Sequence, residues 1–210
     1  MIKLGFVEAD DVRSALTVAG EVIAAGGVVL IPTESYYGLG ADPWCHEAVE
    51  RVLELKGRPA ELGMPVVCGD WQQVETLVRI PDRHRVKLSR IWPAALSVVV
   101  PSRERLPSAR EETLAVRIPD HDNLRVLLYR VGPLTATSAN AHGEPPAVTA
   151  DAALASLHGE PGLVLDGGEL GGGLVSTMVD LATDEGRVIR PGAVGWEQPF
   201  DPEEWVISPS

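Results

Sequence analysis

The stretch VRSALTVAGEVIAAGGVVLIP, residues 12–32, places an amphipathic segment directly before a short apolar run. Asp10 or Asp11 is a suitable N-cap for the amphipathic segment, and Gly26 and Gly27 end its pattern. The run at 28–32 is short, apolar and rich in β-branched residues, which is typical of a buried strand. The apolar residues of the segment recur at the i, i+3 and i+4 spacing of one helix face, namely Val12, Ala15, Leu16, Ala19, Val22 and Ile23. A helix that leads into a buried strand predicts an α/β domain.

The alternation of helical and strand patterns continues to residue 192. The last three expected strands follow one another without intervening helices, so the sheet is predicted to be mixed. The expected domain spans 1–195, and 196–210 form an acidic, loosely packed tail. Further helices are expected near 46–56, 70–78, 81–91, 122–131 and 149–158. Further strands are expected at 64–68, 95–101, 113–119, 134–139, 162–168, 176–182 and 187–192.

The composition is that of a globular α/β domain that needs neither a disulfide nor a metal to fold. The 210 residues are 45% hydrophobic and 23% charged, and a chain of this size buries roughly 70% of its unfolded surface. Cys45 and Cys68 lack CxxC spacing, so free thiols in a reducing compartment are expected, and no metal site is expected. No apolar run approaches the ~18 residues that span a bilayer, and the acidic start MIKLGFVEADD is unlike a secretory signal. We therefore expect no membrane association and a cytoplasmic location.

The charge of the chain is strongly acidic but uneven. A net charge of −12 excludes broad, nonspecific binding of nucleic acid, which requires neutralisation of phosphates. Residues 79–110 nevertheless hold eight Lys or Arg against two acids, a local +6 that leaves −18 elsewhere. Arg83, Lys87 and Arg90 share one face of an expected helix. This segment is either a solvated helix surface or a weak docking site for RNA.

The sequence ELKGRP, residues 54–59, ends the second expected helix with a cation on each side of a glycine. Basic side chains near a helix C-terminus interact favourably with the helix dipole, and glycine followed by proline commonly ends a helix. The same arrangement presents two cations, Lys56 and Arg58, to a phosphate chain. Taken alone, the stretch is compatible with both roles.

Polar side chains cluster where expected strands end, which is where open α/β sheets bind ligands. Residues 33–37, TESYY, follow the strand at 28–32, and Ser138 and Asn140 lie just beyond another strand. The G-x-S-x-G elbow of a hydrolase is missing, so these hydroxyl and amide groups suit hydrogen bonding to a ligand.

Two arginines, Arg117 and Arg190, stand among apolar residues on expected strands. Arginine is costly on a sheet face unless it meets a carboxylate or a phosphate. The chain has no P-loop, and GGELGGG at 167–173 does not follow the Rossmann spacing. Any nucleotide would therefore be held by dispersed cations and hydroxyls.

Seven short motifs occur in one order along the chain, and together they closely resemble the YrdC/TsaC family of L-threonylcarbamoyladenylate synthases. They are PTESYYGLGAD (32–42), ELKGRP (54–59), AVRIPDH (115–121), TSAN (137–140), LDGG (165–168), VSTMVDL (175–181) and IRPG (189–192). The Lys-x-Arg and Ser-x-Asn pairs are the diagnostic signature of the family. The resemblance implies a YrdC-like fold, a twisted mixed β-sheet flanked by helices with a deep, basic, concave cavity.

The resemblance also implies a nucleotidyltransferase reaction. L-threonine, bicarbonate and ATP would give threonylcarbamoyl-AMP and pyrophosphate, with Mg²⁺ bridging the phosphates and no dedicated protein cage for the metal. A separate tRNA-modifying transferase complex would then move the threonylcarbamoyl group to the tRNA adenosine next to the anticodon.

The family motifs assign roles to ten residues of this chain. Lys56 and Arg58 would be catalytic through their grip on the triphosphate. The residues that would bind ATP are Lys56, Arg58, Thr113, Ser138, Asn140 and Arg190. The residues that would bind L-threonine are Thr33, Ser35, Arg117 and Ser176, with Arg117 meeting the carboxylate of the amino acid.

The chain departs from the family pattern at two places. Residues 92–95 are Trp-Pro-Ala-Ala where many relatives have Pro-Gly-Pro after the tryptophan, and GMPVVCGD at 63–70 lacks a histidine that many relatives carry. Two alternatives to the synthase follow from the same motifs. One is a non-catalytic RNA-binding or ribosome-maturation protein, and the other is a carbamoyltransferase domain that handles carbamoyl-adenylates.

Overall fold

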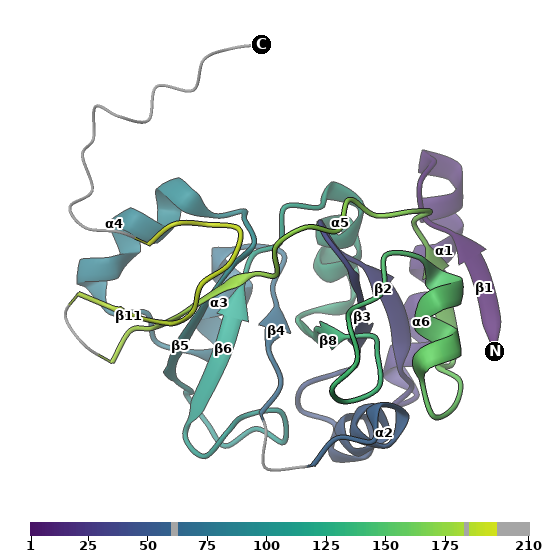
Figure 1. Cartoon of the computed structure of the whole chain (residues 1–210), viewed down its shortest axis with the longest axis horizontal. Coiled ribbons are helices and arrows are strands. Elements are labelled where there is room, and N and C mark those ends of the chain that lie inside the picture. Colours follow the sequence, from purple (N-terminus) through teal and green to yellow (C-terminus); the bar gives the residue numbers. More distant parts are fainter. Residues whose placement is uncertain (60–62, 183–184, 197–210) are drawn as a thin grey trace, which may run out of the picture.

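The structure, a computed structural model, describes residues 1–59, 63–182 and 185–196. Its strands form two sheets that lie side by side, as Figure 1 shows. The five-stranded sheet has the order β1 (Ile2–Gly5), β9 (Leu163–Asp166), β2 (Val29–Pro32), β3 (Tyr37–Gly40) and β8 (Thr137–Ser138). The six-stranded sheet has the order β11 (Arg187–Arg190), β10 (Thr177–Asp180), β5 (Leu96–Pro101), β6 (Thr113–Arg117), β4 (Val66–Val67) and β7 (Leu134–Thr135).

Both sheets are mixed, which confirms the predicted α/β class. In the first, β9 is parallel to both β1 and β2, while β3 is antiparallel to β2 and β8. In the second, β10 is parallel to β5 but antiparallel to β11, and β4 is parallel to β6 but antiparallel to β7. The sequence predicted one mixed sheet, whereas the strands form two.

The expected strand at 134–139 is divided between the two sheets. Thr135 belongs to β7 of the six-stranded sheet and Thr137 to β8 of the five-stranded sheet, so the chain changes sheets at Ala136. The amide of Ala136 donates to the carbonyl of Pro65 at 2.8 Å, which satisfies the backbone at the crossing. This crossing carries Ser138 from one sheet to the other.

Strand β3 is formed by YGLG, a stretch that was not among the expected strands. A Cβ atom on Gly38 would lie 3.3 Å from the carbonyl oxygen of Thr137, and one on Gly40 would lie 3.3 Å from side-chain carbons of Ile31 and Leu134. Glycine in a strand commonly marks such a close approach of neighbouring chain. Strand β1 also went unpredicted, because it is a short edge strand whose residues are mostly exposed.

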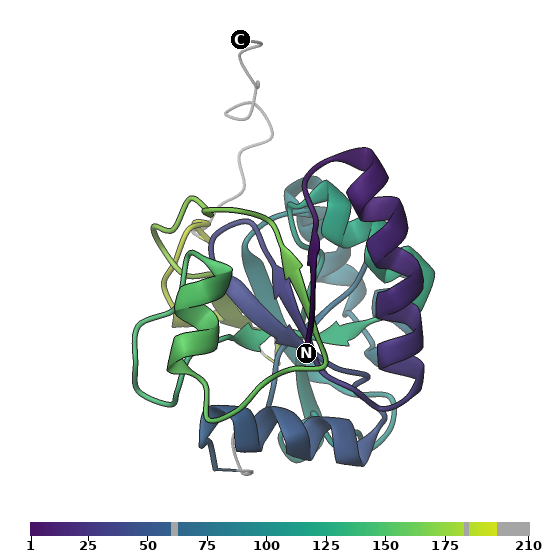
Figure 2. The same cartoon turned by 90° about the vertical axis from the view of Figure 1, so that its right-hand side faces the viewer.

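Helices cover both faces of the five-stranded sheet, as Figure 2 shows for α1 and α6 on opposite sides of it. Alternate residues of β2 point to opposite faces. Val29 and Ile31 pack with α1 (Ala9–Ala24) and α5 (Asp122–Val131), whereas Leu30 packs with α2 (His46–Lys56) and α6 (Ala150–Ser156). Burial on both faces explains the continuous apolar run that predicted this strand.

The start of α1 differs from the prediction. The N-cap is Glu8, which makes no side-chain capping bond, and Asp10 and Asp11 lie inside the first turn. Acidic residues in the first turn interact favourably with the positive end of the helix dipole, which accounts for the pattern that suggested a cap. The other expected helices are present as α2, α3 (Trp71–Leu77), α4 (Asp82–Ile91), α5 and α6.

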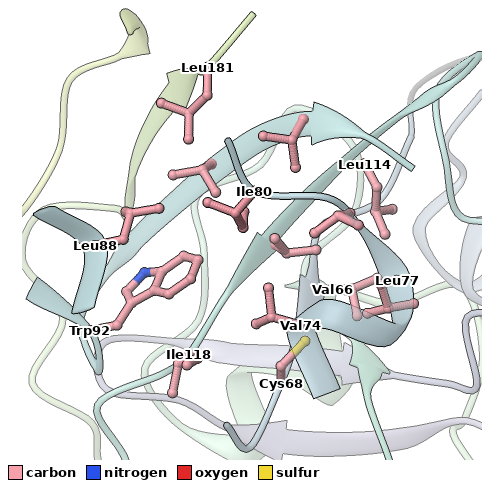
Figure 3. Packing of buried hydrophobic residues seen from close by; sticks show 14 of the residues in the cluster. Val66, Cys68, Val74, Leu77, Ile80, Leu88, Trp92, Leu114, Ile118 and Leu181 are labelled. Carbon is pink, nitrogen blue, oxygen red and sulfur yellow. The ribbon is translucent and has the colours of Figure 1, made fainter. Parts of the chain in front are cut away.

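The six-stranded sheet has one face packed against α3 and α4 and the other face open. On the packed face, residues such as Leu96, Val98, Leu114 and Val116 join Leu88 and Trp92 in a buried cluster that also holds Cys68, shown in Figure 3. His84 is 3% exposed, and its ring lies 6.1 Å from that of Trp196. On the open face, the residues between these apolar positions are free to line a cavity.

The predicted tail begins at a buried residue. Trp196 is 4% exposed and belongs to the core cluster of the six-stranded sheet, so loose packing does not hold at this position. The rest of the expected acidic tail, 197–210, lies outside the described residues.

Residues 92–95, where the chain departs from the family pattern, have an ordinary backbone at the two alanines. Neither Ala94 nor Ala95 has a positive φ, so alanine adopts this backbone without strain. No helix within the described ranges is both long and apolar enough to cross a membrane.

Candidate functional site

A cavity of about 720 Å³ lies on the open face of the six-stranded sheet, next to the loop between β2 and β3 and to β8. Along β6 the side chains of Thr113, Ala115 and Arg117 line it, while Leu114 and Val116 point into the core. Eight of the ten predicted site residues line this cavity: Thr33, Ser35, Arg58, Thr113, Arg117, Ser138, Ser176 and Arg190. The motifs, which are far apart in the sequence, therefore converge on one place.

Lys56 and Asn140 do not line the cavity but lie behind it. Lys56 is 3% exposed, and its ammonium group donates hydrogen bonds to the main-chain oxygen of Ser138 and, at 2.7 Å, to that of Asn140. Burial, together with the nearby charge of Arg58, lowers the pKa of Lys56 to about 8. In this structure Lys56 thus connects the end of α2 to the 138–140 loop.

Asn140 is held by the loop that follows it. Its side-chain nitrogen donates to the carbonyl oxygens of Ala141, at 2.9 Å, and Glu144, at 2.7 Å. Its side-chain oxygen is buried and lacks a hydrogen-bond partner among the residues that the structure describes. The two motifs of the family signature are therefore in direct contact through Lys56, and Arg58 and Ser138 are their members on the cavity wall.

Arg58 leaves the end of α2 in a different direction from Lys56. The helix ends at Gly57, which adopts the left-handed conformation with φ of 58°, as glycine at a helix C-terminus commonly does. The Arg58 guanidinium donates to Thr137 Oγ1 at 3.0 Å and to the carbonyl of Gly63 at 2.9 Å, and burial lowers its pKa. The ELKGRP stretch is thus both a capped helix end and the source of one cavity cation.

Arg117 faces the cavity and forms an ion pair with Glu34. Its Nη1 lies 2.6 Å from Glu34 Oε1, and the two side chains are 10% and 13% exposed. The expectation that an arginine at this strand position needs an anionic partner is confirmed. Glu34 was not predicted as a site residue, although its place inside the PTESYY motif, beside two residues that line the cavity, was a signal.

Arg190 and Ser176 are predicted residues that contact each other. The Arg190 guanidinium donates to the main-chain oxygen of Ser176 at 2.8 Å and to its hydroxyl oxygen at 3.0 Å. Burial and the charge of Arg117 lower the pKa of Arg190, so the two guanidinium groups interact electrostatically. These side chains link β11 to the segment that enters β10.

The cavity is cationic although the whole chain is acidic. Arg110 and Arg187, which were not predicted, join Arg58, Arg117 and Arg190 on its wall, against the two acids Glu111 and Asp180. Five cations and two anions leave a formal +3. Arg187 Nη2 lies 3.4 Å from Asp180 Oδ2, so this pair offsets part of the charge at one side. The arginines are on different elements, so sequence proximity gave no indication of the cluster.

The basic segment 79–110 contributes Arg110 to the cavity, and other cations of the segment contact the core or its surface. Lys87 Nζ lies 3.9 Å from the ring centroid of Trp196, and Arg85 lies 5.1 Å from that of Trp71. Such cation–π contacts are attractive at a protein surface. Docking of tRNA on this segment stays a prediction.

The glycine-rich stretch GGELGGG forms a loop against the PTESYY motif. Gly172 donates to the main-chain oxygen of Ser35 at 3.0 Å, and the Tyr36 hydroxyl donates to the carbonyl of Gly173 at 2.6 Å. The Tyr37 hydroxyl contacts Asp166, Gly167 and Gly168, and burial raises its pKa to about 12. These bonds fix Ser35 beside Thr33, whose hydroxyl donates to the carbonyl of Tyr36 at 2.7 Å.

No group of three or more His, Cys, Asp or Glu that could hold a metal occurs within residues 1–59, 63–182 and 185–196. Cys45 and Cys68 are free thiols, as predicted. The cavity wall presents arginines and small hydroxyl groups, which suit the binding of anions and polar ligands.

Comparison with known proteins gives a consistent result. A family model for Sua5, YciO and YrdC proteins, described as "Telomere recombination", matches residues 21–192. The threonylcarbamoyl-AMP synthase of Pseudomonas aeruginosa (strain UCBPP-PA14) is 40% identical over 178 residues, which cover 82% of this chain and 95% of that protein. The threonylcarbamoyl-AMP synthase of Pseudomonas putida (strain KT2440) is 39% identical over 179 residues, or 83% of this chain and 95% of that protein.

Two solved structures resemble the fold. The Sua5 protein of P. abyssi, solved in complex with L-threonine, superposes with a TM-score of 0.85 at 32% identity over 91% of this chain. The match spans 58% of that longer chain. YciO of E. coli has a TM-score of 0.77 at 22% identity, covering 91% of this chain and 94% of that one, which shows a shared fold alone.

Proposed function

Because the chain belongs to the Sua5/YciO/YrdC family, we propose that it is a threonylcarbamoyl-AMP synthase. The enzyme would form L-threonylcarbamoyl-AMP and pyrophosphate from L-threonine, bicarbonate and ATP. The observation that carries this proposal is the convergence of five arginines and several hydroxyl groups on one cavity of about 720 Å³. Small-molecule sites are typically cavities of roughly 300–1,000 Å³, so one pocket has room for nucleotide and amino acid together.

The proposed chemistry needs positioning and charge stabilisation. Bicarbonate supplies carbon dioxide with loss of hydroxide, and the neutral amine of threonine takes it up as a carbamate, giving up a proton that combines with the hydroxide as water. A carbamate oxygen then attacks the α-phosphorus of ATP. The bond between the α-phosphorus and the bridging oxygen breaks, and pyrophosphate leaves with that oxygen. Negative charge accumulates on phosphate oxygens during this displacement, and fixed cations in a partly dry cavity stabilise such charge strongly. No covalent protein nucleophile is required.

We propose two subsites in the cavity. Arg58, Thr113, Ser138 and Arg190 would contact ATP from the cavity wall, with Lys56 and Asn140 supporting Ser138 from behind. Thr33, Ser35, Arg117 and Ser176 would bind L-threonine, with the carboxylate on Arg117. The first three lie together on the PTESYY loop and the end of β6, and the hydroxyl of Ser176 is within 3.0 Å of Arg190, where the two subsites meet.

Mg²⁺ would accompany ATP and would neutralise charge on its phosphates. The cavity offers two carboxylates, Glu111 and Asp180, rather than a cluster of ligands. This fits Mg²⁺, which is commonly held by substrate phosphates with one or two carboxylates and its own waters. The arginines named above would bind ATP and L-threonine and orient them.

The product would be used by a tRNA-modifying transferase complex that acts on the adenosine next to the anticodon. The need for tRNA and ATP favours a cytoplasmic location.

The direct test is pyrophosphate release from ATP and bicarbonate, measured with and without L-threonine. We expect threonine-dependent pyrophosphate release by the wild-type protein, and a rate of release at least about 100-fold lower in Arg58→Ala. The matched control is Arg79→Ala, whose exposed side chain lies outside the cavity. Its rate of release should be close to that of the wild type. Release that does not depend on threonine would instead favour the carbamoyl-adenylate alternative. Absence of release together with salt-sensitive tRNA binding would favour the RNA-binding alternative.

A further inference from the structure

The ion pair between Glu34 and Arg117 joins the two sheets beside the cavity. Glu34 lies in the loop between β2 and β3 of the five-stranded sheet, and Arg117 is the last residue of β6 in the six-stranded sheet. The partners are 83 positions apart in the sequence. The pair therefore depends on the completed fold, and it fixes the loop of one sheet to a strand of the other.

Burial of this ion pair costs desolvation free energy, so its presence calls for a reason other than stability. Both side chains are largely buried, and Glu34 Oε2 has no hydrogen-bond partner in the part of the chain that the structure describes. Desolvation of two charges commonly offsets their attraction, so well-packed apolar residues often stabilise a fold as much as a buried ion pair does. Stability alone therefore gives little reason for an acid at position 34.

The geometry separates the two partners with respect to the cavity. Arg117 lines the cavity, as do Thr33 and Ser35 on either side of Glu34, whereas Glu34 itself is not among the lining residues. Glu34 contacts Nη1 of a guanidinium that has five N–H donors in a rigid plane. The remaining donors of Arg117 are left for a ligand in the cavity.

We propose that Glu34 is a positioning and selectivity residue that keeps Arg117 turned toward the cavity and reserves it for a carboxylate. This inference rests on the proposed function and deepens it, because it assigns the amino-acid subsite. A guanidinium whose orientation is already fixed loses less entropy when it binds a planar carboxylate. The negative charge of Glu34 also makes the pair close to neutral, so the other N–H groups of Arg117 can bind a planar carboxylate while the pair adds little attraction for a polyanion.

The other cavity arginines explain why such selectivity is needed. Arg190 and Arg117 line the same cavity, and the charge of Arg117 lowers the pKa of Arg190. Two adjacent arginines without a compensating acid resemble a phosphate site. Glu34 would therefore direct the triphosphate to Arg58, Arg110 and Arg190, and would keep the threonine subsite free of it.

The test compares Glu34→Gln, which keeps the shape but removes the charge, with Glu34→Asp, which keeps the charge. Asp122→Asn is the matched control, since it removes the acid from the surface ion pair of Asp122 and Arg125 at 2.7 Å. Threonine affinity is measured by calorimetry without turnover, and KM is measured for threonine and for ATP. Inorganic triphosphate is then tested as an inhibitor against threonine.

We expect Glu34→Gln to raise the threonine Kd and KM by about tenfold or more while the ATP KM changes by less than about threefold. Triphosphate should become competitive with threonine in this variant alone, and Glu34→Asp should recover part of the threonine affinity. Unchanged threonine affinity in Glu34→Gln would overturn the inference and leave the proposed function standing. Equal losses for both substrates with a lower Tm would show a structural role and would also overturn it. If the wild-type protein binds no threonine, the proposed function and this inference fail together.

Discussion

The ammonium group of Lys56 lies 2.7 Å from the main-chain oxygen of Asn140, across 84 positions of sequence. The same group bonds to the main-chain oxygen of Ser138. Two motifs to which the family resemblance assigns the same ligand, ATP, are therefore in direct contact with each other. The contact makes the shape of the 138–140 loop depend on a side chain from α2.

Replacement of Lys56 by methionine should destabilise the fold and weaken ATP binding. Two buried carbonyl oxygens lose their donor, which should lower the free energy of unfolding by about 1–3 kcal/mol. The ATP KM should rise because Ser138 is displaced. Urea denaturation and pyrophosphate release measure the two effects. Arg13→Met, which removes a cation whose side chain is 80% exposed, is the control. If both variants behave alike, Lys56 does not support the loop.

The buried ammonium should also give stability a distinctive pH dependence. The pKa of Lys56 is lowered to about 8 in the folded protein from an ordinary value of 10.5. Between these values the unfolded chain binds more protons than the folded one, so the free energy of unfolding rises with pH. Below about pH 8 the cost of burying the charge is present in full, and it is relieved as the pH rises toward 10.5.

The difference in stability between wild type and Lys56→Met should therefore increase by about 2 kcal/mol between pH 7 and pH 10. The comparison cancels groups that titrate in both proteins. Urea denaturation curves at several pH values measure the difference. Parallel stability profiles for the two proteins would contradict the assignment of this titration to Lys56.

Gly192 should tolerate no side chain. A Cβ atom there would lie 2.2 Å from the main-chain oxygen of Val175 and 2.6 Å from the amide nitrogen of Thr177, both of which are backbone atoms. Gly192→Ala should therefore lower the free energy of unfolding by about 2–4 kcal/mol and disturb the contact between Arg190 and Ser176. Gly195 is the control, because a Cβ added there meets no atom within 4 Å among the described residues beyond its chain neighbours. Gly195→Ala should change stability by less than about 0.5 kcal/mol. Equal effects would show that the close approach at Gly192 is easily relieved.

The two cysteines should differ in reactivity. Cys68 is fully buried, and burial raises the pKa of its thiol, whereas Cys45 is partly exposed at the start of α2. The thiolate is the form that reacts with alkylating reagents. Mass spectrometry after brief treatment with iodoacetamide should show one adduct, on Cys45, for the folded protein and two in denaturant. Rapid modification of Cys68 in the folded protein would mean that the core around it opens readily.

Periodicity predicted most of the elements because it reports which residues are buried. Val29 and Leu30 belong to a strand that is covered on both faces, so a continuous apolar run was a sufficient signal. Strand β3 was not predicted, because it contains Gly38 and Gly40. Glycine allows a strand to approach its neighbours closely, but it is also typical of turns. The division of 134–138 between two sheets has no local signal, because Thr135 and Thr137 differ only in their hydrogen-bond partners.

Eight of the ten residues that the family motifs single out line the cavity, because the fold brings together strand ends and loops that are far apart in the sequence. Their binding roles stay predictions. The place of Lys56 could not be foreseen, because it depends on the turn at Gly57 that sends the side chains of Lys56 and Arg58 in different directions. Glu34 was missed as a partner of Arg117 for a similar reason, since nothing in either motif indicates that the two side chains meet.

Both sheets are completed by strands from the last third of the chain. The first strand, β1, pairs with β9 through contacts such as Ile2 with Leu163, and β5 receives β10 as a parallel neighbour. Contacts between distant parts of a sequence form slowly, because the loop between them must close first. A growing chain on the ribosome therefore carries Arg58 and Arg117 long before Ser176 and Arg190 exist to complete the wall around them. The protein would therefore acquire the complete cavity wall only after residues 176–190 have been synthesised.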